Sequence, residues 1–244
     1  MHLTDRRQHA DLRATGGQLS SPERVIQAIR DGISTGRYVP GQRLIEADLT
    51  RELGVSRGPV REALKRLAAE HIITLNRNKG AYVRLLTRRE ARDLLQVVEE
   101  LLGFAARLAA RHIDDEAHRE HRARFQRSLE RLLEHQNQGF SYAYIEDRDR
   151  FYGAMMAIGG NRELPRLLPV TLVQLQRRQF QRYEAVRDPN LRFTEYRSIG
   201  EAVLAGDARL AERYTRLHVR RIRLAIRRLP DEAFAQERNG YHRR

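Results

Sequence analysis

The sequence predicts a mainly α-helical protein of two domains, a small N-terminal domain with a short β-hairpin and a larger bundle of antiparallel helices. Apolar residues recur at helical spacing through most of the 244 residues. The β-like stretch is confined to residues 72–84. A capping-box pattern from Thr87 to Glu90 then opens a second part that reads as helical throughout.

These changes of pattern set the domain boundaries. Residues 1–19 are polar and lack periodicity, which is typical of a flexible tail. We expect a small domain of helices and a hairpin over residues 20–86, a helical domain over residues 87–230 and a C-terminal tail over residues 231–244.

The first predicted helix has two possible starting points. Ser20 has capping-box spacing to Glu23, whereas Ser21 stands directly before Pro22, a residue favoured at the first helical position. Either register ends the helix near Gly36.

Two short helices joined by a tight turn follow. The second helix is expected over about residues 46–53, and Ser56 can cap a third helix after the turn at Gly54. In the third helix an apolar stripe points one way and basic side chains lie away from it. The stripe is Val60, Ala63, Leu64 and Leu67, and the basic residues are Arg57, Arg61, Lys65 and Arg66.

A basic β-hairpin follows the third helix. Residues 72–75 and 81–84 flank a turn-forming loop, Asn76-Arg77-Asn78-Lys79-Gly80. Three helices followed by such a hairpin indicate a winged helix-turn-helix.

This fold places the N-terminal end of the third helix in the major groove of DNA. Arg57 and Arg61 lie one turn apart at that end, and a guanidinium can bridge guanine O6 and N7 or bind a phosphate. The alternative is an ordinary three-helix core with a solvated basic face. The residues that we expect to bind DNA are Ser56, Arg57, Arg61, Lys65, Arg77, Lys79 and Gly80.

Composition narrows the classes of function. The 46 Lys and Arg residues exceed the 32 Asp and Glu residues, and the net charge of +14 favours a polyanionic partner, nucleic acid first. There is no apolar run of about 18 residues for a membrane span, and no apolar leader is apparent. The absence of cysteine excludes thiolate metal sites and suits a cytoplasmic protein. No nucleophile elbow, P-loop or dinucleotide motif occurs, so we expect no enzyme.

Residues 40–83 resemble the N-terminal domain of GntR-type regulators. The resemblance is carried by residues 40–49 (PGQRLIEADL), residues 53–64 (LGVSRGPVREAL), Leu67 and residues 80–83 (GAYV). It implies that Arg57 and Arg61 contact operator DNA. Ala47 departs from the pattern, because some members have a DNA-contacting arginine there.

The second domain is expected to contain helices only. Pro165 and Pro169 should kink or shorten the fourth of these helices. The expected helices cover about residues 88–112, 115–137, 141–158, 162–186, 191–205 and 208–229.

Residues 88–229 resemble, more loosely, the FCD ligand-binding domain of the FadR branch of this family. The matching positions include residues 101–110 (LLGFAARLAA), Phe151, residues 160–161 and His218. The resemblance implies a homodimeric repressor that binds a small metabolite, often an organic acid.

Many FCD domains hold a divalent metal with an aspartate, a histidine four residues later and two further histidines. The corresponding positions here are Arg148, Tyr152, Tyr196 and His218. One imidazole does not satisfy a metal that needs several ligands, and an arginine would repel the cation. We therefore predict no metal and no cofactor.

The replaced positions suit an anionic ligand such as a carboxylate. Arg148 and Tyr152 share one helical face, which Tyr144 extends, and a guanidinium with phenol donors binds an acid group well. The alternative is that Arg148 pairs with a buried acidic residue while the tyrosines only pack. The predicted effector-binding residues are Arg148, Tyr152, Tyr196, His218, Tyr144 and Arg221.

Together these observations predict a cytoplasmic homodimeric repressor on near-palindromic double-stranded operator DNA, with an affinity modulated by a small carboxylate and no membrane contact. Two alternatives remain at this point: an FCD regulator with a non-standard metal site, and an architectural DNA-binding protein without a ligand.

Overall fold

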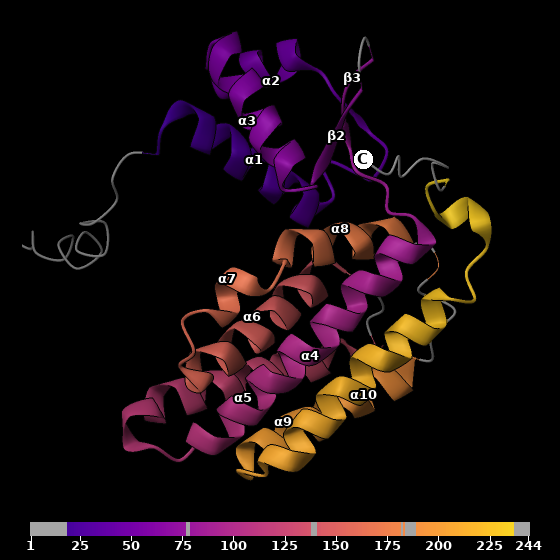
Figure 1. Ribbon diagram of the computed structural model, residues 1–244. Coiled ribbons are helices and arrows are strands. Elements are labelled where there is room, and N and C mark those ends of the chain that lie inside the picture. Colours follow the sequence, from indigo (N-terminus) through magenta and orange to yellow (C-terminus); the bar gives the residue numbers. More distant parts are fainter. Residues whose placement is uncertain (1–18, 77–78, 138–140, 182, 184–188, 237–244) are drawn as a thin grey trace, which may run out of the picture.

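The computed structural model describes residues 19–76, 79–137, 141–181, 183 and 189–236. It contains a small three-helix domain with a sheet, placed on one end of a larger helical bundle (Figure 1). The elements are α1 Ser21–Thr35, β1 Arg43–Leu44, α2 Glu46–Leu53, α3 Arg57–Ala69, β2 Ile73–Asn76, β3 Gly80–Val83, α4 Arg88–His112, α5 Arg119–Glu134, α6 Tyr142–Gly159, α7 Leu164–Leu167, α8 Val170–Phe180, α9 Pro189–Leu204 and α10 Ala208–Ile226.

The N-terminal domain is a winged helix-turn-helix, as predicted. Of the two possible starts of α1, the structure uses Ser20, whose backbone N–H donates to the Glu23 carboxylate at 3.0 Å. Gly54 between α2 and α3 has φ of 62°, a conformation that glycine adopts without steric cost. The apolar stripe of α3, including Val60 and Leu67, is fully buried against α1.

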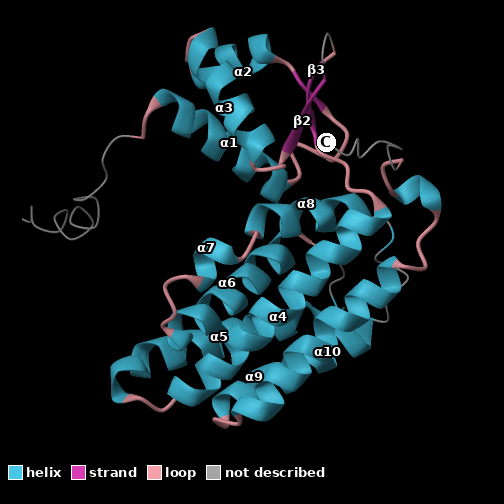
Figure 2. Ribbon diagram, viewed as in Figure 1, coloured by secondary structure: helices cyan, strands magenta, loops and turns pink. Residues whose placement is uncertain are grey.

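The sheet of this domain has one strand more than the predicted hairpin. Strands β2 and β3 pair antiparallel, with Ile73 opposite Val83. The additional strand β1 pairs with the other edge of β3, so the strand order is β1-β3-β2. Figure 2 shows this sheet beside α3 at the top of the molecule.

The C-terminal domain is a helical bundle around a core that includes Phe125, Phe151 and Met155, all with 0% exposure. The expected fourth helix of this domain is divided, because Leu168 is extended and α8 begins only after Pro169. Helix α4 begins with the predicted capping box and runs along α10. No helix among the described residues has the length and apolar character needed to cross a membrane.

The two domains meet at α8. Helix α1 packs on α8, and Arg178 donates to the carbonyl oxygen of Ser34. Buried Gln179 accepts from the backbone N–H of Leu86 at 2.8 Å and donates to the carbonyl oxygens of Leu86 and Ala233, each at 2.9 Å. Leu86 lies in the short connection between β3 and α4, so α8 holds the link between the domains.

The first part of the expected C-terminal tail is packed against this junction. Residues 231–233 form a short 3-10 turn, and Phe234 is 7% exposed. The Phe234 ring lies 5.1 Å from that of Phe180 and under the guanidinium of Arg88 at 4.2 Å. The backbone N–H of Ala235 donates to Leu86 at 3.0 Å.

Candidate functional site

Helix α3 presents a basic face to solvent. Its apolar stripe is buried in the domain, which leaves Arg57, Arg61 and Lys65 exposed at intervals of four residues. The side chain of Arg61 is 63% exposed, and its Nε donates to the Glu46 carboxylate at 3.0 Å. Ser56 is exposed at the N-cap position. These four predicted residues therefore lie on or beside one exposed helix face.

The hairpin tip lies next to the start of this helix. Gly80 has φ of 92°, and Lys79 is exposed beside it, whereas Arg77 lies outside the described residues. Arg57 and Gly80 border a common surface depression of about 350 Å³. The remaining residues around this depression are Arg43, Leu44, Ile45, Glu46, Ala47 and Ala81.

The fold adds Arg43 and Glu46 to the residues predicted for the DNA-binding surface. Arg43 belongs to β1, and its guanidinium lies near Gly80 across the sheet. Glu46 begins α2 and binds the Arg61 side chain. Both stand within the segment that resembles GntR regulators, but no local pattern distinguishes them. Ala47 also lies here, so the position that departs from the family pattern is on this same surface.

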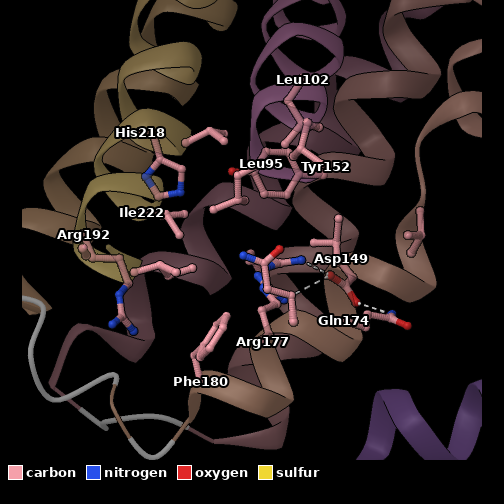
Figure 3. A pocket seen from close by; sticks show the side chains of 18 of the residues that line it. Leu95, Leu102, Asp149, Tyr152, Gln174, Arg177, Phe180, Arg192, His218 and Ile222 are labelled. Atoms are coloured by element: carbon pink, nitrogen blue, oxygen red, sulfur yellow. Dashed lines mark hydrogen bonds and ion pairs between the residues drawn. The ribbon is translucent and has the colours of Figure 1, made fainter. Parts of the chain in front are cut away.

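A cavity of about 320 Å³ lies within the helical bundle. Helices α4, α6, α8, α9 and α10 all contribute side chains to its wall, some of which are drawn in Figure 3. Five of the six predicted effector-binding residues line it: Tyr144, Arg148, Tyr152, Tyr196 and His218. The structure thus brings together residues separated by more than 70 positions in the sequence.

The tyrosines of the cavity form a connected group. The hydroxyl groups of Tyr144 and Tyr196 are hydrogen-bonded at 3.1 Å, and the Tyr196 ring lies 4.8 Å from the His218 ring. Burial, reinforced by Tyr144 and Tyr152, raises the pKa of Tyr196 well above that of an ordinary tyrosine. Its hydroxyl group therefore stays protonated at neutral pH and can donate a hydrogen bond.

Arg148 keeps its positive charge although it is only 8% exposed. Burial by itself would lower the pKa of Arg148, but Asp149 and three tyrosines together raise it above its ordinary value. Its guanidinium lies 5.5 Å from the centre of the Tyr152 ring. A buried permanent cation in a cavity wall favours an anionic ligand.

Arg148 is also paired with an acidic residue, Asp149, whose side chain is 31% exposed. Its Nη2 donates to Asp149 at 2.6 Å. The same carboxylate lies 3.8 Å from Arg177 and accepts from Gln174 at 3.2 Å, the interactions drawn in Figure 3. Two guanidinium groups therefore share one carboxylate. Several buried polar atoms of residues in the cavity wall have no hydrogen-bond partner among the described residues, including Arg148 Nε, Arg177 Nη1 and Gln176 Oε1.

The sixth predicted residue, Arg221, is not part of the cavity wall, although the sequence predicts it there. Its guanidinium binds Glu195 at 2.7 Å. The same buried carboxylate accepts a 2.6 Å hydrogen bond from Nδ1 of His218. Arg221 therefore acts behind the pocket, where it helps to hold the carboxylate that orients the imidazole.

The donor set of the cavity does not fit a divalent metal. The charged group at the position of a metal-binding aspartate is Arg148, and His218 is the imidazole in the described part of the wall. Asp149 is already bound by two arginines and a glutamine. Within the described ranges, no three His, Cys, Asp or Glu residues form a group that could hold a metal ion.

Sequence reasoning missed the contribution of α8 to the cavity. Gln174, Gln176, Arg177 and Phe180 of this helix line the wall, and so does Asp149 of α6. The sequence shows the spacing of the α8 residues on one helical face. Nothing local indicates that this face meets the tyrosines of α6 and α9.

Comparisons with known proteins agree with this architecture. Residues 22–83 match the family described as bacterial regulatory proteins, gntR family, and residues 93–221 match the FCD domain. The chain is 40% identical over 79 residues to the Nta operon transcriptional regulator of Aminobacter aminovorans, which covers 32% of this chain and only 38% of that protein.

Two further matches extend over most of the chain. A probable D-xylose utilization operon transcriptional repressor of Paenarthrobacter nicotinovorans is 25% identical over 193 residues, 77% of this chain and 80% of that protein. The solved structure of E. coli McbR/YncC superposes with a TM-score of 0.71 at 21% identity, covering 86% of this chain and 98% of that one. This last likeness concerns the fold.

Proposed function

The chain belongs to the GntR family of DNA-binding transcriptional regulators, in the branch that carries an FCD domain, and we propose that it is a repressor controlled by a small carboxylate. In this proposal it acts in the cytoplasm as a homodimer whose two α3 helices bind the half-sites of a near-palindromic operator. The acid binds in the cavity of the helical bundle without a metal ion and changes the affinity for the operator.

The observation that carries this proposal is the position of α8 between the cavity and the DNA-binding domain. Arg177 and Phe180 of α8 line the cavity. Arg178 and Gln179 of the same helix bind Ser34 in α1 and Leu86 in the connection between the domains. A ligand that shifts α8 must therefore change contacts with the DNA-binding domain.

The test has two steps. An operator is first selected from a pool of random duplexes with the full chain, and its Kd is measured by fluorescence anisotropy at fixed salt. The measurement is then repeated with a panel of carboxylic acids, and with Zn²⁺, Ni²⁺ or EDTA. We expect an acid to change Kd by about 5- to 150-fold, the usual range of allosteric coupling, and we expect metals and EDTA to have no effect. A response to metal alone would favour the metal-dependent alternative, and no response to any addition would favour an architectural protein.

Replacing Arg148 with alanine tests the pocket itself. We expect the binding of the active acid to weaken by at least about 30-fold, because a buried charge-assisted contact is lost. Arg166→Ala removes an arginine that is 74% exposed on α7 and should leave binding unchanged. Calorimetric titration of both variants measures the effect. Unchanged affinity of the Arg148 variant would refute the pocket assignment.

Replacing Gln179 with methionine tests the role of α8 in coupling. The change removes three hydrogen bonds to Leu86 and Ala233 at nearly constant side-chain volume. We expect the acid to bind as before, while its effect on the operator Kd falls at least about fivefold. The variant leaves the buried backbone N–H of Leu86 without its partner, which should also lower the free energy of unfolding by about 1–3 kcal/mol. Gln126→Met, on the exposed face of α5, is the control. Full coupling in a folded Gln179 variant would contradict this role.

A further inference from the structure

Much of the cavity wall is hydrocarbon. Leu95, Val98 and Leu102 of α4 face it from one side, and Val219 and Ile222 of α10 from another. In Figure 3, Leu95, Ile222 and Phe180 lie around the space on the side of the pocket away from Gln174, where His218 and Arg192 also lie. Val98 and Val219 are each 2% exposed. These aliphatic side chains offer no hydrogen bond to the hydroxyl groups of a polar ligand.

Arg148, Asp149 and Arg177 form one compact charged cluster in the wall, whereas Arg192 of α9 lies on the other side of the cavity (Figure 3). Arg148 and Arg177 share the single carboxylate of Asp149, which leaves one positive charge uncompensated in this cluster. Arg148 Nε and Arg177 Nη1 are buried and have no hydrogen-bond partner in the part of the chain that the structure describes. A carboxylate group bound at this cluster would supply both the missing charge and acceptors for these two donors.

From these two surfaces we infer that the ligand is an amphipathic monocarboxylate, with an acid group at Arg148 and Arg177 and an alkyl or aryl body against α4 and α10. This inference rests on the proposed function and narrows it, because it excludes polyhydroxylated acids as good ligands. It also assigns a binding role to Arg177, which sequence reasoning did not select.

The sharpest test compares two acids of equal charge and carbon number. Hexanoate and gluconate each carry one carboxylate on six carbons, but gluconate has a hydroxyl group on every remaining carbon. Calorimetric titration of the full chain should give a Kd for hexanoate that is lower by roughly 100-fold, since each buried methylene strengthens binding about fourfold. Hexanol, which has the apolar body without the charge, should bind at least roughly tenfold more weakly than hexanoate.

Two neighbouring valines supply a matched pair of variants. Val98 lines the cavity, whereas Val97 is 52% exposed and is not part of the cavity wall. Val98→Thr places a hydroxyl group in the apolar wall at nearly the same volume, and we expect hexanoate to bind roughly tenfold more weakly. Val97→Thr should leave the Kd unchanged. Thermal unfolding without ligand checks that both variants fold.

The possible outcomes separate this inference from the proposed function. Preference for hexanoate together with loss of affinity in Val98→Thr supports the amphipathic ligand. Equal or stronger binding of gluconate overturns it but leaves a carboxylate-controlled repressor intact. Hexanol binding as tightly as hexanoate overturns the role of Arg148 and Arg177. If neither acid binds, the inference fails, and the proposed function fails with it only when the wider panel also leaves the operator Kd unchanged. Should Val98→Thr not fold, the comparison of the two acids on the unmodified chain still decides.

Discussion

Simultaneous replacement of Arg57 and Arg61 with alanine is expected to weaken operator binding by at least about 100-fold. Both side chains are exposed on α3, one turn apart, and the packing of the opposite face positions them rigidly. A bidentate contact between arginine and guanine contributes about 1–3 kcal/mol of discrimination, so two such contacts account for this loss. Fluorescence anisotropy with the selected operator at constant salt measures it.

The control for this variant must remove the same charge elsewhere. Arg119→Ala combined with Arg124→Ala serves this purpose, since both residues are exposed on α5, at the end of the bundle far from α3 (Figure 1). The control should retain nearly full affinity. Thermal unfolding should show both double variants to be as stable as the parent, because exposed substitutions cost about 0.5 kcal/mol or less. Equal losses in both variants would mean that net charge, rather than α3, holds the DNA.

Replacing Glu195 with alanine is expected to lower the free energy of unfolding by about 3–5 kcal/mol. This buried carboxylate binds Nδ1 of His218 at 2.6 Å and Arg221 at 2.7 Å. Its removal leaves polar and charged partners without compensation, which is far more costly than losing a surface ion pair. Chemical denaturation followed by circular dichroism measures the change. His218 should also lose its fixed orientation, so binding of the active acid should weaken.

Glu201→Ala, on the exposed face of the same helix, is the matched control and should change the free energy of unfolding by about 0.5 kcal/mol or less. A Glu195 variant as stable as this control would show that the carboxylate contributes nothing to the fold. If the variant loses this stability but still binds the acid, His218 has no role in binding, because the imidazole has then lost its orientation without consequence.

The winged helix-turn-helix could be predicted from local signals because its helices are short and each has its own start, stop and apolar stripe. Gly54 and the alternation of buried and exposed positions along α3 place Arg57 and Arg61 on the solvent face. Strand β1 is different. It consists only of Arg43 and Leu44 and exists because the edge of β3 lies beside it. Two residues carry no periodicity from which a strand could be inferred.

The residues of the cavity also fall into some that local signals predict and others that they do not. The sequence predicts Arg148 and Tyr152 as site residues, because they stand four residues apart on one helix and at positions that match a known domain. The sequence does not predict Arg177, because its contact with Asp149 depends on where α8 packs after the break at Pro169. The spacing of Arg221 to His218 predicts a place in the pocket, yet its guanidinium binds Glu195 behind the wall.

The sequence alone determined most of the helices, the hairpin of β2 and β3, and the family resemblance, because hydrophobic periodicity and capping act over a few residues. The tertiary structure alone decided which charged groups meet. It placed Arg177 beside Asp149, Glu195 behind His218 and Gln179 at the connection between the domains. Ion pairs and buried hydrogen bonds act over a few ångströms between residues that are far apart in the chain, so only the packing of the helices fixes them.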